Sequence, residues 1–201
     1  MSGQHSNLFA QIAAQQQADA AAAAAYPVSY VPSSEKELIR SSIVTKIYAV
    51  CHPVTVTSGN GKTNHWTLSF DVGNGRGVRL DIGPNPQQTH TNGGGKAWIV
   101  LSSLEYLVTR NAKRYDLIAV TYLRPIGWYM DYLASGGRFQ YAFTSEGVGC
   151  RRWISDTLKL LSDVGEVNSN ESELARRALA YLWPSQEASE PAAGVYFKGL
   201  E

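Results

Sequence analysis

Cys150 lies where a sequence can make a thiol reactive. The segment GVGCRRWI, residues 147–154, places it after a glycine loop, at the start of an expected helix and directly before Arg151 and Arg152. The first N–H groups of a helix have no partner within it, and the helix dipole adds about half a positive charge there. These features and the two arginines favour the thiolate, which lowers a thiol pKa from its free value of about 8.5. Cys150 is therefore a candidate nucleophile. It also lies on the apolar stripe of the same helix, so a buried packing role is the alternative.

A nucleophilic thiol needs an imidazole partner, and His65 is the best-placed candidate. Residues 65–71, HWTLSFD, alternate polar and apolar side chains, which is typical of a half-buried strand and puts His65 on the polar face. The other histidines fit less well: His5 lies near the N-terminus, His52 follows Cys51 where packing is expected, and His90 lies in a glycine-rich loop. The alternative for His65 is a partly buried strand residue that bonds only to backbone.

Asp81 is expected to orient that imidazole. The turn GNGRG, residues 73–77, predicts a hairpin, and its return strand alternates so that Asp81 lies on the polar face. Same-face residues on paired strands lie about 5 Å apart, so His65 and Asp81 can meet, although the sequence does not fix the register. A helix start docked on this face would complete a Cys–His–Asp constellation. The alternative for Asp81 is a rim charge beside Arg79.

Residues beside these three complete the expected site. We expect the substrate to be bound by Asn64, Trp66, Arg79, Gly149, Arg151 and Trp153. The backbone N–H of Cys150 is expected to bind an oxyanion. No metal is expected, because two cysteines and scattered histidines do not supply four close nitrogen and sulfur ligands. No cofactor is expected either, since GNGRG follows a strand but opens no helix.

Composition limits the classes of function. The chain has 201 residues and a formal net charge of +1, with no basic stripe, which argues against nucleic acid. It contains no run of 18 apolar residues, so no membrane span is expected. The first 27 residues lack Lys and Arg, so no secretory signal is expected. Two cysteines fit free thiols in a reducing compartment, which predicts a cytoplasmic protein.

The elements that must position these residues predict an α+β fold. Residues 1–37 are rich in Ala and Gln and are expected to form an arm, as a marginal helix or a disordered segment, before a domain at 38–184 and a tail at 185–201. Helical patterns fall at 124–137, 150–165 and 171–184, and strand patterns at 43–56, 64–71, 78–82, 97–110, 116–122 and 138–143. We expect a mostly antiparallel sheet of five or six strands with helices packed on one side.

Four short motifs carry a resemblance to known proteins. CHPV at 51–54, NHW at 64–66, VRLDI at 78–82 and GVGCRRWI resemble an uncharacterised family of fungal proteins, over about residues 43–164. The order of an early strand histidine and a late cysteine at a helix start is similar to circularly permuted papain-like folds of the NlpC type. That resemblance implies a permuted papain-like fold with Cys150 as nucleophile, His65 as base and Asp81 as the orienting acceptor. The Ala- and Gln-rich arm departs from the pattern.

Three functions follow from these residues. The first is a cysteine-dependent acyl-transfer enzyme that hydrolyses, transfers or cyclises an amide, peptide or thioester, with a small-molecule or peptide substrate as its partner. The second is a non-catalytic module on the same fold that binds a ligand or a protein. The third is a non-covalent enzyme of fungal secondary metabolism that uses the pocket without a thiolate.

Overall fold

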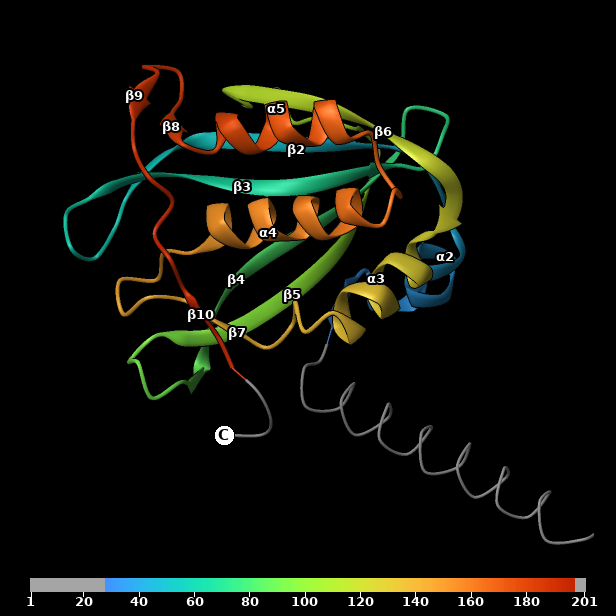
Figure 1. Ribbon diagram of the computed structural model, residues 1–201. Coiled ribbons are helices and arrows are strands. Elements are labelled where there is room, and N and C mark those ends of the chain that lie inside the picture. The colour runs from blue at the N-terminus through green and yellow to red at the C-terminus, as the bar shows by residue number, and fades with distance from the viewer. Residues whose placement is uncertain (1–27, 198–201) are drawn as a thin grey trace, which may run out of the picture.

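Runs rich in β-branched and aromatic residues form the strands of one curved sheet. The computed structural model describes residues 28–197. Seven strands follow the order β10-β7-β5-β4-β3-β2-β6, and β1 pairs with β5 in parallel, so that the sheet has eight strands (Figure 1). Its strands are β1 (Val28–Val31), β2 (Ile43–Val56), β3 (Lys62–Asp71), β4 (Gly77–Thr89), β5 (Gly95–Leu104), β6 (Arg114–Pro125), β7 (Tyr141–Ala142) and β10 (Val195–Tyr196).

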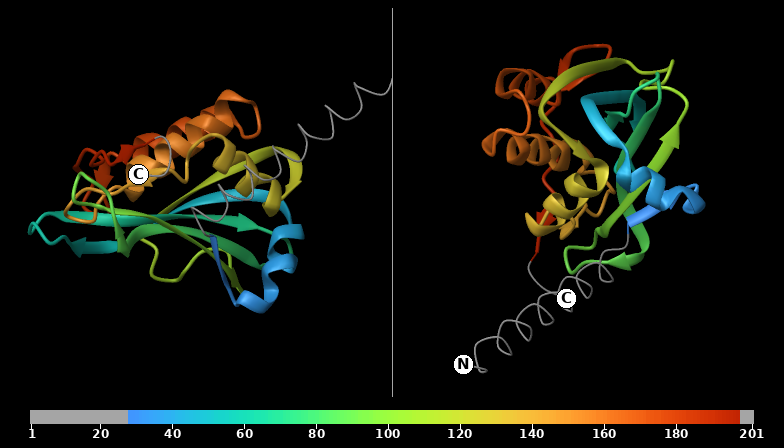
Figure 2. Two further views of the ribbon diagram at one scale, coloured as in Figure 1. Left: turned by 90° about the horizontal axis from the view of Figure 1, so that it is seen from below. Right: turned by 90° about the vertical axis from the view of Figure 1, so that its right-hand side faces the viewer.

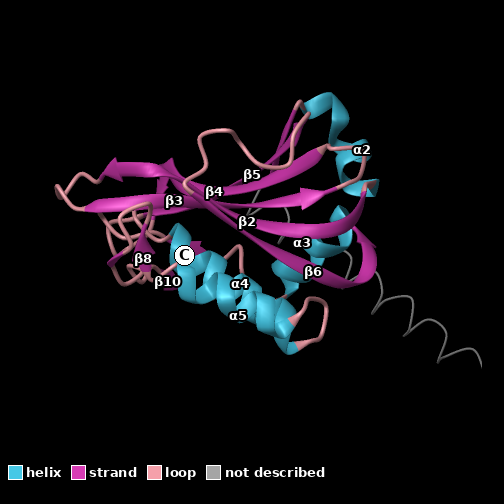
Figure 3. Cartoon of the chain, turned by 90° about the horizontal axis from the view of Figure 1, so that it is seen from above, coloured by secondary structure: helices cyan, strands magenta, loops and turns pink. Residues whose placement is uncertain are grey.

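The helices lie along the sheet and leave its other face to loops. Three of them, α3 (Ile126–Ser135), α4 (Cys150–Asp163) and α5 (Ser169–Ala178), cover one face (Figure 3). A 3-10 turn, η1 (Ser33–Glu35), leads into α2 (Lys36–Ser41), which packs beside α3 at one end of the sheet (Figure 2). Two short strands, β8 (Tyr181–Leu182) and β9 (Glu187–Ala188), form a separate hairpin after α5.

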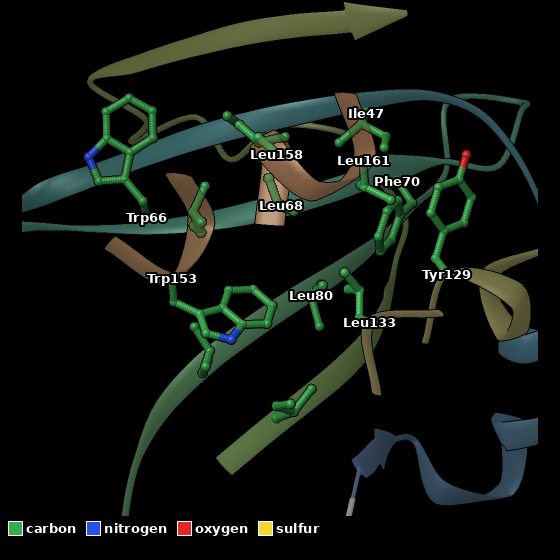
Figure 4. Close-up of a cluster of buried hydrophobic side chains, with 14 of the residues drawn as sticks. Ile47, Trp66, Leu68, Phe70, Leu80, Tyr129, Leu133, Trp153, Leu158 and Leu161 are labelled. Atoms are coloured by element: carbon green, nitrogen blue, oxygen red, sulfur yellow. The ribbon is translucent and has the colours of Figure 1, made fainter. Parts of the chain in front are cut away.

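The core lies between the sheet and α4. The apolar side of β3 carries Trp66, Leu68 and Phe70, and the stripe of α4 carries Trp153, Leu158 and Leu161 (Figure 4). Each of these side chains is at most 1% exposed. Burial of a large apolar side chain stabilises a fold by about 1.5–3 kcal/mol relative to its exposure. The strand period of two and the helix period of 3.6 therefore fix how α4 docks on β3.

The α+β class and the packing of α3, α4 and α5 on one face of a mostly antiparallel sheet are confirmed. The sheet has eight strands rather than five or six, because β1 and β10, with four and two residues, lie in the segments expected to form the arm and the tail. β2 runs through Pro53, where its register with β3 shifts between Cys51 and Val54. Such a bulge accommodates a residue that cannot donate to the ladder.

Segments on both sides of the expected domain pair with the sheet. β1, at 28–31, lies within the segment expected to form an arm, and η1 and the start of α2 follow within the same segment, while residues 1–27 of that arm lie outside the described residues. Residues 195–196, within the expected tail, pair with β7 as β10. The described tail therefore contributes to the same fold as residues 38–184.

Candidate active site

His65 and Asp81 form a short hydrogen bond on the sheet face away from the helices. His65 Nε2 lies 2.7 Å from Asp81 Oδ1, and the two side chains are 35% and 28% exposed. Leu68 opposes Leu80 in the β3–β4 ladder, and by that register Asp81 is a diagonal neighbour of His65. Diagonal side chains of this length reach one another across a strand pair. The second ring nitrogen of His65, Nδ1, is left for another partner.

Cys150 reaches His65 through a split in the sheet. β3 and β4 pair only from Leu68 to Asp71, so the start of β3 has no β4 partner beside it. The Cys150 Sγ lies against this part of β3, where it accepts a hydrogen bond from the Trp66 backbone N–H and lies 4.0 Å from the Asn64 carbonyl oxygen. From there the thiol makes a side-chain hydrogen bond with His65. The first residue of a helix on one face thus contacts a side chain that belongs to the other.

The charges of the three groups stabilise one another. Burial raises the pKa of the Cys150 thiol, but the hydrogen bond and charge of His65, the Trp66 N–H and the charge of Arg151 hold this pKa below its usual value. Burial lowers the pKa of His65, but its hydrogen bonds to Asp81 and Cys150 raise it to about 10. Burial raises the pKa of Asp81, and the His65 hydrogen bond outweighs this and lowers it. All three shifts favour the charged forms, a thiolate, an imidazolium and a carboxylate.

His52 is a neighbour that the sequence placed among packing residues. Its ring lies 5.6 Å from the His65 ring, centroid to centroid, and its Nε2 lies 3.0 Å from Thr67 Oγ1. Burial and the positive charge of His65 lower the pKa of His52. A neutral His52 beside a charged His65 follows. The sequence signal that could have placed His52 beside His65 is Pro53, because a proline within a strand indicates a bulge, where the alternation of faces changes.

A cavity of about 170 Å³ opens at Cys150 on the helix side of the split. Its wall is polar and apolar in equal parts, with hydroxyls and charged groups among the lining residues: Thr57, Gly61, Lys62, Thr63, Glu146, Val148, Gly149, Cys150, Arg151, Ser189, Glu190 and Ala192. The Thr57 hydroxyl is buried and has no hydrogen-bond partner. Neither His65 nor Asp81 lines this cavity, so the thiol lies between the cavity and the imidazole.

Two of the six expected substrate-binding residues line the cavity. Gly149 adopts φ 154°, and a Cβ there would come within 2.7 Å of the Tyr141 hydroxyl oxygen, so the close approach requires glycine. Arg151 is 5% exposed, and its guanidinium donates to the Leu179 and Ser189 carbonyls at 3.0 and 2.7 Å. The residues that flank Cys150 therefore form part of the wall beside the thiol.

The other four lie away from the cavity. Trp66 and Trp153 are fully buried in the core, and Trp153 Nε1 donates to the Arg138 carbonyl at 2.6 Å. Asn64 is fully buried, and its amide bonds three times to the backbone of His52 and Trp183. Arg79 lies on the other face, 3.8 Å from Asp81. Their substrate-binding role stays a prediction.

The residues described contain no group of three His, Cys, Asp or Glu side chains placed to hold a metal ion. Both cysteines among them are free thiols. Burial raises the pKa of Cys51 to about 12, and this side chain is fully buried. The pKa values of the two thiols are therefore shifted in opposite directions, and only Cys150 has the environment of a nucleophile.

The chain belongs to an uncharacterised family. The family model described as "Domain of unknown function (DUF7770)" matches residues 47–197, which include Cys150, His65 and Asp81. Membership of an uncharacterised family is thereby confirmed. No curated protein and no solved structure matches the chain. Among the described residues, no helix is long and apolar enough to cross a membrane.

Proposed function

We propose that this protein is a cysteine-dependent acyl-transfer enzyme. The observation that carries the proposal is one imidazole, His65, that hydrogen-bonds at 2.7 Å to Asp81 and also to the Cys150 thiol. Nucleophile, base and orienting carboxylate in this order are the parts of a catalytic triad, which is recognised by geometry rather than by sequence order. The order also resembles that of permuted papain-like enzymes, in which these roles fall to a cysteine and a strand histidine.

The reaction would proceed through a thioester. The Cys150 thiolate attacks the carbonyl carbon of a substrate, and the carbonyl electron pair moves onto oxygen. The tetrahedral intermediate expels its leaving group, which takes a proton from the His65 imidazolium. Water or a second nucleophile then gives a proton to His65 and attacks the thioester, and collapse releases the thiolate. Asp81 holds the imidazole ring in one orientation throughout.

The helix start would stabilise the oxyanion. Cys150 is the first residue of α4, so its N–H has no acceptor within the helix. An N–H that points at developing negative charge in a site closed to water contributes about 2.7–4 kcal/mol to catalysis. The cavity beside it, about 170 Å³, is smaller than the roughly 300–1,000 Å³ of pockets that enclose a drug-sized ligand. A small acyl group fits it better than a long one.

Alkylation by iodoacetamide tests the proposal. We expect Cys150 to be alkylated at pH 6–7 faster than a free thiol such as glutathione, and we expect Cys150→Ala to abolish labelling as read by peptide mass spectrometry. Cys51→Ala is the matched control and should label as the native chain does, since burial keeps Cys51 protonated. Labelling that stays on Cys51 in Cys150→Ala, or a Cys150 rate equal to that of glutathione, would contradict the assignment.

A second candidate function is binding without catalysis. One observation favours it: Cys150 is 7% exposed and separates the cavity from His65. A ligand could then fill the cavity without contact with the base. This candidate predicts that unmodified Cys150 never carries an acyl group after incubation with p-nitrophenyl acetate. An acetyl group found on Cys150 by mass spectrometry, and absent in His65→Ala, would exclude it.

A further inference from the structure

Arg151 is a buried cation without a carboxylate partner. Its guanidinium is 5% exposed and donates four hydrogen bonds, all to neutral acceptors: the carbonyls of Leu179, Ser189 and Glu190 and the Ser189 hydroxyl, at 3.0, 2.7, 3.2 and 3.1 Å. Its neighbour Arg152 is solvent-exposed and pairs with Asp156 at 3.0 Å. Burying an arginine this far is costly unless a negative charge lies nearby. No carboxylate within 28–197 makes an ion pair with Arg151.

The Cys150 thiolate is the anion that can compensate the buried charge of Arg151. The positive charge of Arg151 acts on two thiols, Cys150 and Cys51, and lowers the pKa of each. Cys51 stays protonated, because burial raises its pKa to about 12. Burial lowers the pKa of Arg151, yet a guanidinium remains charged at neutral pH. The Cys150 thiolate and the Arg151 guanidinium thus carry opposite charges on the cavity side of the site, where Lys62, Glu146 and Glu190 also line the wall.

Arg151 also fastens one wall of the cavity. We call residues 189–194 the strap; it leaves β9, passes the start of α4 and continues into β10 (Figure 1). Ser189, Glu190 and Ala192 of the strap line the cavity. Arg151 holds the first two residues of the strap, as given above. On the other side of Cys150, the Tyr141 hydroxyl donates to the Gly149 carbonyl at 2.9 Å. The same hydroxyl accepts a hydrogen bond from the Gly194 N–H, at the end of the strap, at 3.0 Å.

We propose that Arg151 is a positioning residue that ties the strap over the cavity and provides the countercharge of the Cys150 thiolate. The inference rests on the proposed function, because it assigns Arg151 to the same nucleophile. The four strap and helix acceptors fix the guanidinium beside the thiol, so closure of the strap and the charge at the thiol depend on one side chain. A strap that opens would release the guanidinium and remove its charge from the site.

Substitution of Arg151 by Met and by Lys tests both parts. The readouts are the midpoint of Cys150 alkylation by iodoacetamide between pH 5 and 9, and backbone hydrogen exchange of residues 189–194. The titratable and charged groups that face Cys150 or the cavity are His65, Cys51, Tyr141, Arg151, Lys62, Glu146 and Glu190. Burial raises the pKa values of Cys51 and Tyr141 to about 12, so neither titrates in this range.

For Arg151→Met we expect a midpoint raised by about one pH unit, a rate about tenfold lower below the midpoint, and faster exchange in the strap. Arg151→Lys keeps the charge but lacks the planar fork, so we expect the midpoint to recover while strap exchange stays fast. If the Met variant does not fold, a Lys midpoint equal to that of the native chain, with a loosened strap, supports the proposal. A Lys midpoint raised by a full unit overturns it.

Arg152→Met is the matched control, since it removes a solvent-exposed arginine one residue away, and both readouts should stay as in the native chain. A faster strap exchange in Arg151→Met with an unchanged midpoint would show a purely structural arginine and would overturn the proposal. Failure of the proposed function looks different. In that case the native chain itself alkylates with the midpoint of a free thiol, whatever residue is at 151.

Discussion

Replacement of Asp81 by Asn tests whether the carboxylate sets the charge of the other two groups. Asp81 Oδ1 lies 2.7 Å from His65 Nε2, a distance typical of a charge-assisted hydrogen bond. An amide oxygen can accept the same N–H, so the variant keeps the orientation and removes the charge. An opposite charge at this range shifts a pKa by about 1–3 units. Both side chains are about one third exposed, so solvent screens the pair and the lower end applies.

The expected result has a definite sign. Loss of the carboxylate charge lowers the pKa of His65, and a less stable imidazolium raises the pKa of the Cys150 thiol. We expect the midpoint of iodoacetamide alkylation to rise by about one unit, which reduces the rate below the midpoint about tenfold. His65 ring resonances, followed by NMR, should titrate at lower pH than in the native chain.

Asp163→Asn is the control, because that carboxylate is exposed and pairs only with Lys159 on the same helix. It should leave the alkylation profile unchanged. If Asp81→Asn alkylates with the native midpoint and His65 titrates as before, the carboxylate does not control the pair and the reasoning fails.

Two further predictions concern stability. The raised pKa of His65 gives stability that is complete below its unfolded value of about 6.5 and is lost as pH rises toward 10, while the lowered pKa of Cys150 gives stability that is complete above about 8.5 and is lost as pH falls. The contribution of the pair to the free energy of unfolding should therefore be flat between about pH 6.5 and 8.5 and fall on either side. Urea titrations of the native chain and of Cys150→Ala across this range measure that contribution as the difference between their free energies of unfolding. If this difference keeps rising above pH 9, the ion pair is refuted. Asn64→Ala leaves backbone groups of His52 and Trp183 without partners in a fully buried place, so we expect a loss of about 3 kcal/mol in urea unfolding. Thr63→Ala at the preceding, partly exposed residue is the control and should cost well under half as much, and an equal cost for both would remove the special role of Asn64.

The parts of the site that the sequence predicted depend on local periodicity. Alternation in residues 65–71 and 78–82 puts His65 and Asp81 on one face, and the short turn between the strands brings them together. The helical stripe from 150 turns Cys150 toward the sheet. These are consequences of side-chain direction within one element, which a single sequence contains.

The rest depends on contacts between distant segments. The split between β3 and β4 arises where the two paired strands separate, before Leu68 in β3 and after Leu80 in β4, and no residue pattern marks the point. Arg151 binds Ser189, 38 residues further along the chain, in a segment without regular structure. Arg151 and Arg152 are adjacent and identical in type, yet Arg151 is buried and Arg152 pairs with Asp156 on the surface. Tertiary context alone decides between them.

Because the two cysteines have opposite environments, their alkylation rates report whether the chain is folded. The contact of Cys150 with the start of β3 joins residues 86 apart in sequence, so the low thiol pKa exists only in the folded chain. Unfolding returns Cys150 to an ordinary thiol and makes it slower to alkylate near pH 6. The same event frees Cys51 from a fully buried place and makes it faster. A single alkylating agent thus reads the folded and the unfolded populations at once, as loss of label at one cysteine and gain at the other.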